Sequence, residues 1–180
     1  MLFRSGVEAA AHTGGDGLSS SLTYLLLYTV LVIGSFTVIF IVAGRGDGAT
    51  SLDDFKGLAK RRPILALAFT VLLLAQAGVP FTGGFIAKFG VIKSAVEVHS
   101  YAIAIAAMVA AVIGAFLYLR IMVSMWLDDP SSTEPVLIPR ASGAVVGLAV
   151  LFTLFVGIFP GWLLDATRLV ATYRDLTSSN

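Results

Sequence analysis

The fold of this chain is decided by the stretch Pro63-ILALAFTVLLLAQAGVPFTGGFIA-Lys88-FGVI-Lys93. This stretch is long enough to span a membrane, but residues that break a helix interrupt it and it contains a charged lysine. No residue from Pro63 to Ala87 is charged. A charged side chain at membrane depth costs about 2.5–3.5 kcal/mol on insertion scales, and residues kept at that cost are usually pore, relay or counter-ion groups. The stretch therefore predicts that Lys88 serves ion or proton movement, and snorkelling of its side chain toward the interface is the alternative.

A proline and three glycines interrupt this stretch just before Lys88. As one straight helix, residues 63–96 would approach about 50 Å, which exceeds a bilayer core of about 30 Å. Non-helical backbone is tolerated at that depth only where it is buried in protein or lines a wet cavity. We therefore predict two half-helices joined by non-helical backbone, with the break at Gly78, Pro80, Gly83 and Gly84.

The composition is that of an integral membrane protein. Of the 180 residues, 57% are hydrophobic and only 13% are charged, and the mean hydropathy is +0.92. Soluble domains are about 45–50% apolar and about 25% charged. The formal net charge of +1 gives no support for nucleic-acid binding. The absence of cysteine excludes disulfides, iron–sulfur clusters and thiol catalysis, and no His, Asp and Glu residues have metal-ligand spacing.

Four segments are long and apolar enough to span a bilayer, so we predict an all-α integral membrane fold. An extramembrane segment, residues 1–21, precedes the membrane domain, and residues 170–180 form a tail. Met1-Leu-Phe-Arg-Ser5 resembles the translation of a sequencing adapter, so we expect residues 1–21 to be partly artefactual and the chain to be the carboxyl-terminal part of a longer subunit. The membrane domain extends over residues 22–169, and its spans are 22–43, 63–96, 101–127 and 141–164.

Positive charge predicts the orientation. The connection between the first two spans collects five basic residues, and such excess favours the cytoplasmic side. We therefore expect residues 45–62 in the cytoplasm and both chain ends outside. The basic residues of this connection are Arg45, Lys56, Lys60, Arg61 and Arg62.

Other polar residues near Lys88 are weaker candidates. Lys93, Glu97 and His99 lie toward the outer mouth, where they would form an exit relay or serve as plain interfacial residues. A second group would hold water between charged groups or act as interhelical glue. Its members are Gln76, Thr70, Thr82 and Tyr118.

Several blocks of this sequence resemble a known family. They are Asp54-Phe-Lys-Gly-Leu58, Lys60-Arg-Arg-Pro63, Ala77-Gly-Val-Pro-Phe-Thr-Gly-Gly-Phe-Ile-Ala-Lys-Phe89, Tyr118-Leu-Arg120 and Gly157-Ile-Phe-Pro-Gly161. Together they resemble the antiporter-like membrane subunits, and within them subunit N of bacterial NADH:quinone oxidoreductase, respiratory complex I. The resemblance runs from about Tyr24 to about Leu169. One departure is Pro80-Phe81, where a Pro-Pro pair is commoner.

The resemblance implies a fold of two inverted five-helix repeats, each with one broken helix, of which this chain would supply the last four helices. Lys88 would match the proton-channel lysine of the second repeat. The chain would be a non-redox, proton-translocating subunit that binds no cofactor itself, while the whole complex uses NADH and quinone. It would reside in the inner (plasma) membrane of a bacterium, and its partners would be other membrane-arm subunits and the lipid bilayer, with no nucleic acid. A cation/proton antiporter subunit and a non-conducting scaffold without independent activity remain alternatives.

Overall fold

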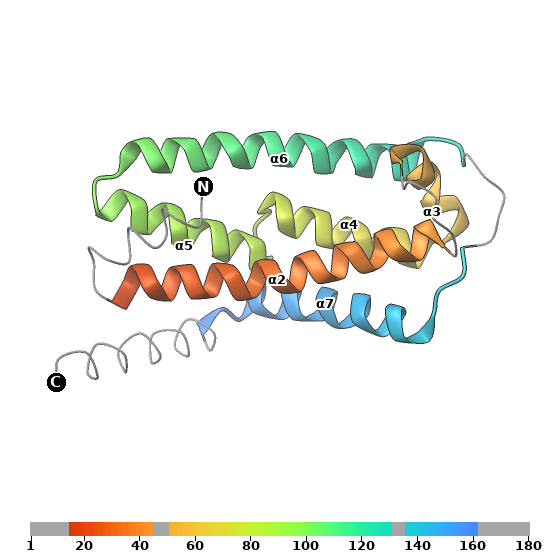
Figure 1. Cartoon of the computed structure of the whole chain (residues 1–180), viewed down its shortest axis with the longest axis horizontal. Helices are drawn as coiled ribbons and strands as arrows, with labels where there is room; N and C mark the ends of the chain where they lie inside the picture. The colour runs from red at the N-terminus through yellow and green to blue at the C-terminus, as the bar shows by residue number, and fades with distance from the viewer. Residues whose placement is uncertain (1–14, 45–50, 131–135, 162–180) are drawn as a thin grey trace.

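The computed structural model describes residues 15–44, 51–130 and 136–161, and all regular structure in these residues is helical. Figure 1 shows α4 and α5 end to end beside the long helix α6, with α2 and α7 on their other side. The predicted all-α architecture is confirmed. The elements are α2 (Gly15–Ala43), the 3-10 helix η1 (Leu52–Phe55), α3 (Leu58–Arg61), α4 (Pro63–Ala77), α5 (Gly83–Glu97), α6 (Tyr101–Leu127) and α7 (Arg140–Ile158).

Three of these helices are long and apolar enough to cross a membrane within the described ranges: Ser21–Ala43, Tyr101–Leu127 and Arg140–Ile158. Helices α4 and α5 have 15 residues each. At 1.5 Å per residue, each is about 22 Å long and cannot cross a core of about 30 Å by itself. The two half-helices together run beside α6 (Figure 1). That they make a single membrane crossing stays a prediction.

The predicted break of the second segment is confirmed, and it occupies residues 78–82. Gly78 ends α4 with φ +88°, a left-handed conformation that glycine adopts at helix ends without steric cost. Phe81 also has a positive φ, 67°. The prediction was wrong for Gly83 and Gly84: the backbone becomes helical again at Gly83, so these two residues form the first turn of α5 and not part of the break.

The last helix is shorter than the predicted span 141–164. Helix α7 ends at Ile158, immediately before Phe159-Pro160-Gly161. A proline disfavours helical backbone in the residue before it, which explains the stop. Residues 162–164, the first 14 residues and the tail 170–180 lie outside the described part of the chain.

The buried core lies around α4, and apolar side chains also cover the outside of the bundle. Phe69 and Leu72 of α4 are almost completely buried. The large apolar side chains of Phe36 on α2, Val112 on α6 and Leu148 on α7 are 65%, 70% and 67% exposed. Such extensive apolar surface is unusual for a soluble monomer and suits a lipid environment. The packing agrees with a multi-pass membrane protein.

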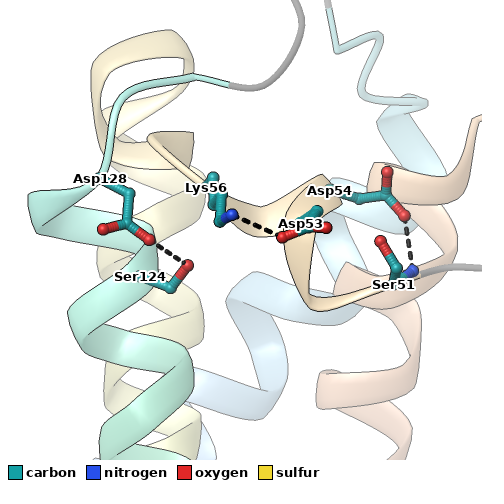
Figure 2. Close-up of polar contacts among 6 residues, drawn as sticks. All are labelled: Ser51, Asp53, Asp54, Lys56, Ser124 and Asp128. Atoms are coloured by element: carbon teal, nitrogen blue, oxygen red, sulfur yellow. Dashed lines mark hydrogen bonds and ion pairs between the residues drawn. The ribbon is translucent and has the colours of Figure 1, made fainter.

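Polar contacts organise the end of the bundle that carries η1 and α3. Figure 2 shows the Ser51 backbone N–H donating to Asp54 at 2.6 Å and Lys56 paired with Asp53 at 2.6 Å. On α6, the Ser124 hydroxyl donates to Asp128 at 2.8 Å. Asp53 raises the pKa of Lys56 because its carboxylate stabilises the charged ammonium. Each of these contacts joins residues that are three or four apart in the sequence.

Two further contacts tie this end together across the chain. Lys60 pairs with Asp129 at 2.6 Å, and the Gly57 backbone N–H donates to the Ser124 carbonyl at 3.2 Å. A Cβ on Gly57 would lie 2.5 Å from the Pro130 nitrogen, so only glycine fits this approach. The connections that follow α2 and α6 therefore meet at one end of the bundle. That this end faces the cytoplasm stays a prediction.

Candidate functional site

Lys88 spans the break between the two half-helices. It lies on the second turn of α5 and is half-buried. Its Nζ donates hydrogen bonds to the carbonyl oxygens of Gln76 and Ala77, at 2.6 and 3.0 Å. A helix leaves its last four carbonyls without internal partners, and a cation near them interacts favourably with the helix dipole. Lys88 therefore caps the carboxyl end of α4 from the other side of the break.

The proline explains why one of these carbonyls is available. In a continuous helix the Gln76 carbonyl would accept from the backbone N–H of residue 80. Pro80 has no backbone N–H, so that partner does not exist. The Gln76 backbone carbonyl instead accepts hydrogen bonds from two side chains, Lys88 Nζ and the Tyr28 hydroxyl, the latter at 3.2 Å. The break thus creates the acceptor that holds the lysine.

Gly78 makes room for the lysine as well as ending α4. A Cβ at this position would lie 3.0 Å from Lys88 Cδ and 3.5 Å from Nζ. Such a contact is tighter than side chains normally make, and the positive φ already disfavours any residue with a Cβ. Two independent constraints, backbone conformation and the path of Lys88, therefore favour glycine here.

The lysine borders a cavity of about 180 Å³ between α2, α4, α5 and α6. Since a water molecule takes about 30 Å³ of liquid volume, several waters fit in this space. The cavity combines one amine with hydroxyl and amide groups on a mainly apolar wall, and such a site can hydrate an amine and pass a proton to water. Its polar lining residues are Lys88, Gln76, Tyr24, Tyr28 and Tyr118.

The three predicted exit residues lie apart from this cavity. Lys93 pairs with Glu97 at 3.6 Å, one turn apart on α5, and both side chains are well exposed. His99 Nδ1 lies 3.0 Å from the Tyr101 hydroxyl. None of the three lines the Lys88 cavity as the structure describes it. An exit relay through Lys93, Glu97 and His99 stays a prediction.

The predicted water-holding residues divide into two groups. Gln76 and Tyr118 line the cavity, and the Gln76 side-chain amide donates to the Ser35 hydroxyl on α2. Thr70 accepts a hydrogen bond from the Trp126 indole at 2.9 Å, which is the interhelical role. The Thr82 hydroxyl donates to the Val79 carbonyl at 2.6 Å and so shapes the break itself.

Sequence reasoning missed the tyrosine pair on α2. The rings of Tyr24 and Tyr28 stack, with centroids 4.4 Å apart, and both line the cavity. Residues four apart on a helix share one face, so two tyrosines at this spacing in an otherwise apolar span were an available signal. The signal could not indicate which helix that face meets.

A threonine on α7 fixes the start of α5 and was also missed. The Gly83 backbone N–H donates to Thr153 Oγ at 3.2 Å, and Thr153 is only 1% exposed. This hydroxyl satisfies one of the N–H groups that a helix start leaves free. Next to it, a Cβ on Gly84 would lie 1.7 Å from the Ala75 oxygen, so the two half-helices touch where only glycine fits.

Comparison with known proteins identifies relatives of this arrangement. The sequence model of the family described as "NADH:quinone oxidoreductase/Mrp antiporter, TM" matches residues 7–114. NADH-quinone oxidoreductase subunit N 1 of Herpetosiphon aurantiacus is 41% identical over 93% of this chain and 34% of its own length. The corresponding protein of Solibacter usitatus is 36% identical, over 93% of this chain and 35% of its own. The chain therefore spans about a third of the length of these curated relatives.

Solved structures share the fold. A chain of the Mrp complex from Dietzia sp. superposes with a TM-score of 0.79 at 22% identity, covering 91% of this chain and 39% of its own length. A chain of respiratory complex I from Thermus thermophilus gives a TM-score of 0.74 at 21% identity, covering 92% and 43%. At these identities the likeness concerns the fold alone.

Proposed function

The chain belongs to the NADH:quinone oxidoreductase/Mrp antiporter transmembrane family, and on that premise we propose that it acts as a subunit N in the proton-translocating membrane arm of an NADH:quinone oxidoreductase. The subunit N relatives support this choice within the family. The observation that carries the proposal is Lys88, whose Nζ bridges the break while bordering a cavity large enough for water. Its neighbours in the membrane would be other membrane-arm subunits.

Lys88 would work as a proton-exchanging group. In its ammonium form it donates to the Gln76 and Ala77 carbonyls, which hold the charge at the end of α4. Release of one proton to cavity water leaves a neutral amine, which binds these carbonyls less strongly because a charged donor makes the stronger hydrogen bond. NADH and quinone chemistry would take place on other subunits, and this chain would only move protons.

A cation/proton antiporter subunit is the second candidate, favoured by the family description, which joins NADH:quinone oxidoreductase with the Mrp antiporter. The same lysine would then exchange protons against a cation gradient without redox chemistry. The two functions separate in membrane vesicles: NADH-driven proton uptake indicates the first, while cation-driven proton movement without NADH indicates the second. If the chain is a non-conducting scaffold, replacing Lys88 should change neither kind of proton movement.

The test replaces Lys88 in the full-length subunit, assembled in its complex. Lys88→Ala should lower coupled proton transfer and quinone-linked turnover more than about tenfold, since proton relays contribute factors of that order or larger. Lys88→Arg should not restore them fully, because a guanidinium stays protonated. Lys93→Ala, a lysine on the exposed side of the same helix, serves as the matched control and should have a mild effect. Normal pumping by an assembled Lys88→Ala complex would remove the relay role.

A further inference from the structure

We propose that Tyr28 is a positioning residue for Lys88. The Tyr28 hydroxyl keeps the Gln76 carbonyl hydrogen-bonded, so that Lys88 can leave this carbonyl when the lysine loses its proton. This inference rests on the proposed function, because it concerns the same lysine. The two donors come from different helices: Tyr28 from α2, at 3.2 Å, and Lys88 from α5, at 2.6 Å. They meet on one oxygen of α4.

Pro80 removes the backbone donor that the Gln76 carbonyl would otherwise have. A buried carbonyl that loses its last hydrogen bond costs far more than one that exchanges partners. If Lys88 were the only protein partner, every departure of the lysine would leave this oxygen without a protein donor and dependent on cavity water. The Tyr28 hydroxyl prevents that, since a carbonyl oxygen has two lone pairs and accepts from both donors.

The tyrosine is held in place independently of the lysine. Its ring stacks on Tyr24, at a centroid distance of 4.4 Å and an interplanar angle of 17°. The Gln76 side chain adds a second tie to α2 through Ser35. Helix α2 and the end of α4 are therefore joined at two points, and the hydroxyl stays near the carbonyl whether or not Lys88 is charged.

Loss of the hydroxyl has a defined direction. With phenylalanine at position 28, the Gln76 oxygen has only Lys88, so the ammonium form is held more tightly relative to the neutral amine. Proton release then requires a higher pH. The titratable side chains that face the cavity are Lys88 itself, Tyr24 and Tyr28 of α2, and Tyr118 of α6. Helix α4 has no titratable residue, and α7 has only Arg140, at its first position.

The experiment uses the full-length subunit in its assembled complex and measures NADH-driven proton pumping between pH 6 and about 9, the range around neutral pH in which a relay amine must titrate. Tyr28→Phe should lower pumping about tenfold at neutral pH and move the pH optimum up by about one unit, since one unit corresponds to a tenfold change in equilibrium. Thr29→Val is the matched control. It removes a hydroxyl from the neighbouring position of α2, where Thr29 is exposed and bonds only to its own helix, and it should leave rate and optimum unchanged.

The position of the pH optimum does not depend on how much complex assembles, so it decides the question even where Tyr28→Phe lowers the amount. An unchanged optimum, or one displaced to lower pH, would overturn the inference, including when the rate falls. Measuring Lys88→Ala in parallel distinguishes failure of the proposed function from failure of the Tyr28 role. If Lys88→Ala pumps normally, the proposed function fails. If Lys88→Ala is inactive and Tyr28→Phe keeps the wild-type pH profile, only the role of Tyr28 fails.

Discussion

The side-chain nitrogen of Lys88 lies 2.6 Å from the backbone oxygen of Gln76, twelve residues earlier and on the other side of the helix break. A charged donor of this kind makes a hydrogen bond about twice as strong as a neutral one. The bond joins α4 to α5 through a side chain at the point where their backbones are not helical. The charge and the break are therefore parts of one arrangement.

Replacing the proline should disturb function more than folding. Pro80→Ala returns a backbone N–H that can compete with Lys88 for the Gln76 carbonyl. The glycine that ends α4, Gly78, remains, so the break should persist in most of the assembled protein. We expect about a tenfold loss of coupled turnover with less than about a twofold loss of assembled subunit, on the scale of a lost charge-assisted hydrogen bond. Equal losses of both would count against a functional break.

Adding a single methyl group at the contact of the half-helices should destabilise the fold. A Cβ on Gly84 would lie 1.7 Å from the Ala75 oxygen, which belongs to the backbone and cannot move aside alone. We expect Gly84→Ala to cost about 3 kcal/mol or more, at the upper end of overpacking effects. Thermal unfolding of the purified protein in detergent measures this. Gly147→Ala, whose Cβ would meet nothing within 4 Å, is the control, and an equal loss of stability in both variants would contradict the prediction.

The hydroxyl at the start of α5 should be worth a buried hydrogen bond. Thr153→Val keeps the shape of the side chain but leaves the Gly83 N–H without its acceptor. The expected cost is about 1–3 kcal/mol, the penalty of an unsatisfied buried donor. The control is Thr37→Val, which removes an exposed hydroxyl that bonds to the Ile33 carbonyl of its own helix. If the two variants unfold at the same temperature, Thr153 does not serve as this cap.

The ion pair between Lys60 and Asp129 should make a small contribution that depends on pH. Lys60 holds the pKa of Asp129 below its ordinary value of 3.8. The carboxylate therefore stabilises the folded state above that ordinary pKa, and the contribution is lost as the pH falls through the lowered pKa. Because both side chains are largely exposed, Asp129→Asn should lower Tm at neutral pH by no more than about 2 °C.

The difference between Asp129→Asn and the unaltered protein should disappear once the pH falls below the lowered pKa of Asp129, because the carboxyl is then protonated in both the folded and the unfolded state. It should also shrink in about 1 M salt, where the screening length is near 3 Å. A difference that persists in acid or in salt would indicate that Asp129 acts through something other than its charge.

The membrane crossings can be tested by labelling, because the chain contains no cysteine. Single-cysteine variants at Ser51 and Asp129, which lie at the same end of the bundle, should react with an impermeant thiol reagent from the cytoplasmic side. A cysteine in place of His99, in the connection at the other end of α5, should react from outside. Labelling of all three positions from one side would contradict the four-span arrangement.

The sequence by itself determined the membrane class, the all-helical fold and the break. Hydrophobic length fixes spans because every backbone group in lipid must bond within a helix. A proline and a left-handed glycine end a helix through their own covalent structure, so Gly78 and Pro80 could be interpreted without a fold. The proline even identifies the Gln76 carbonyl as an oxygen without a backbone donor. Lys88 could be identified as a candidate because a charged side chain in an apolar membrane segment is costly and is usually functional.

Only the tertiary structure decided which side chains bond to the Gln76 carbonyl and to the Gly83 N–H. Tyr28 lies 48 residues before Gln76, and Thr153 reaches Gly83 from 70 residues away. Helical periodicity shows which residues share a face, but not which helix that face meets. The packing of α2 and α7 against the broken helix supplied those partners. It also separated Lys93, Glu97 and His99 from the cavity, since Lys93 and Glu97 lie further along α5 and His99 lies in the connection that follows it.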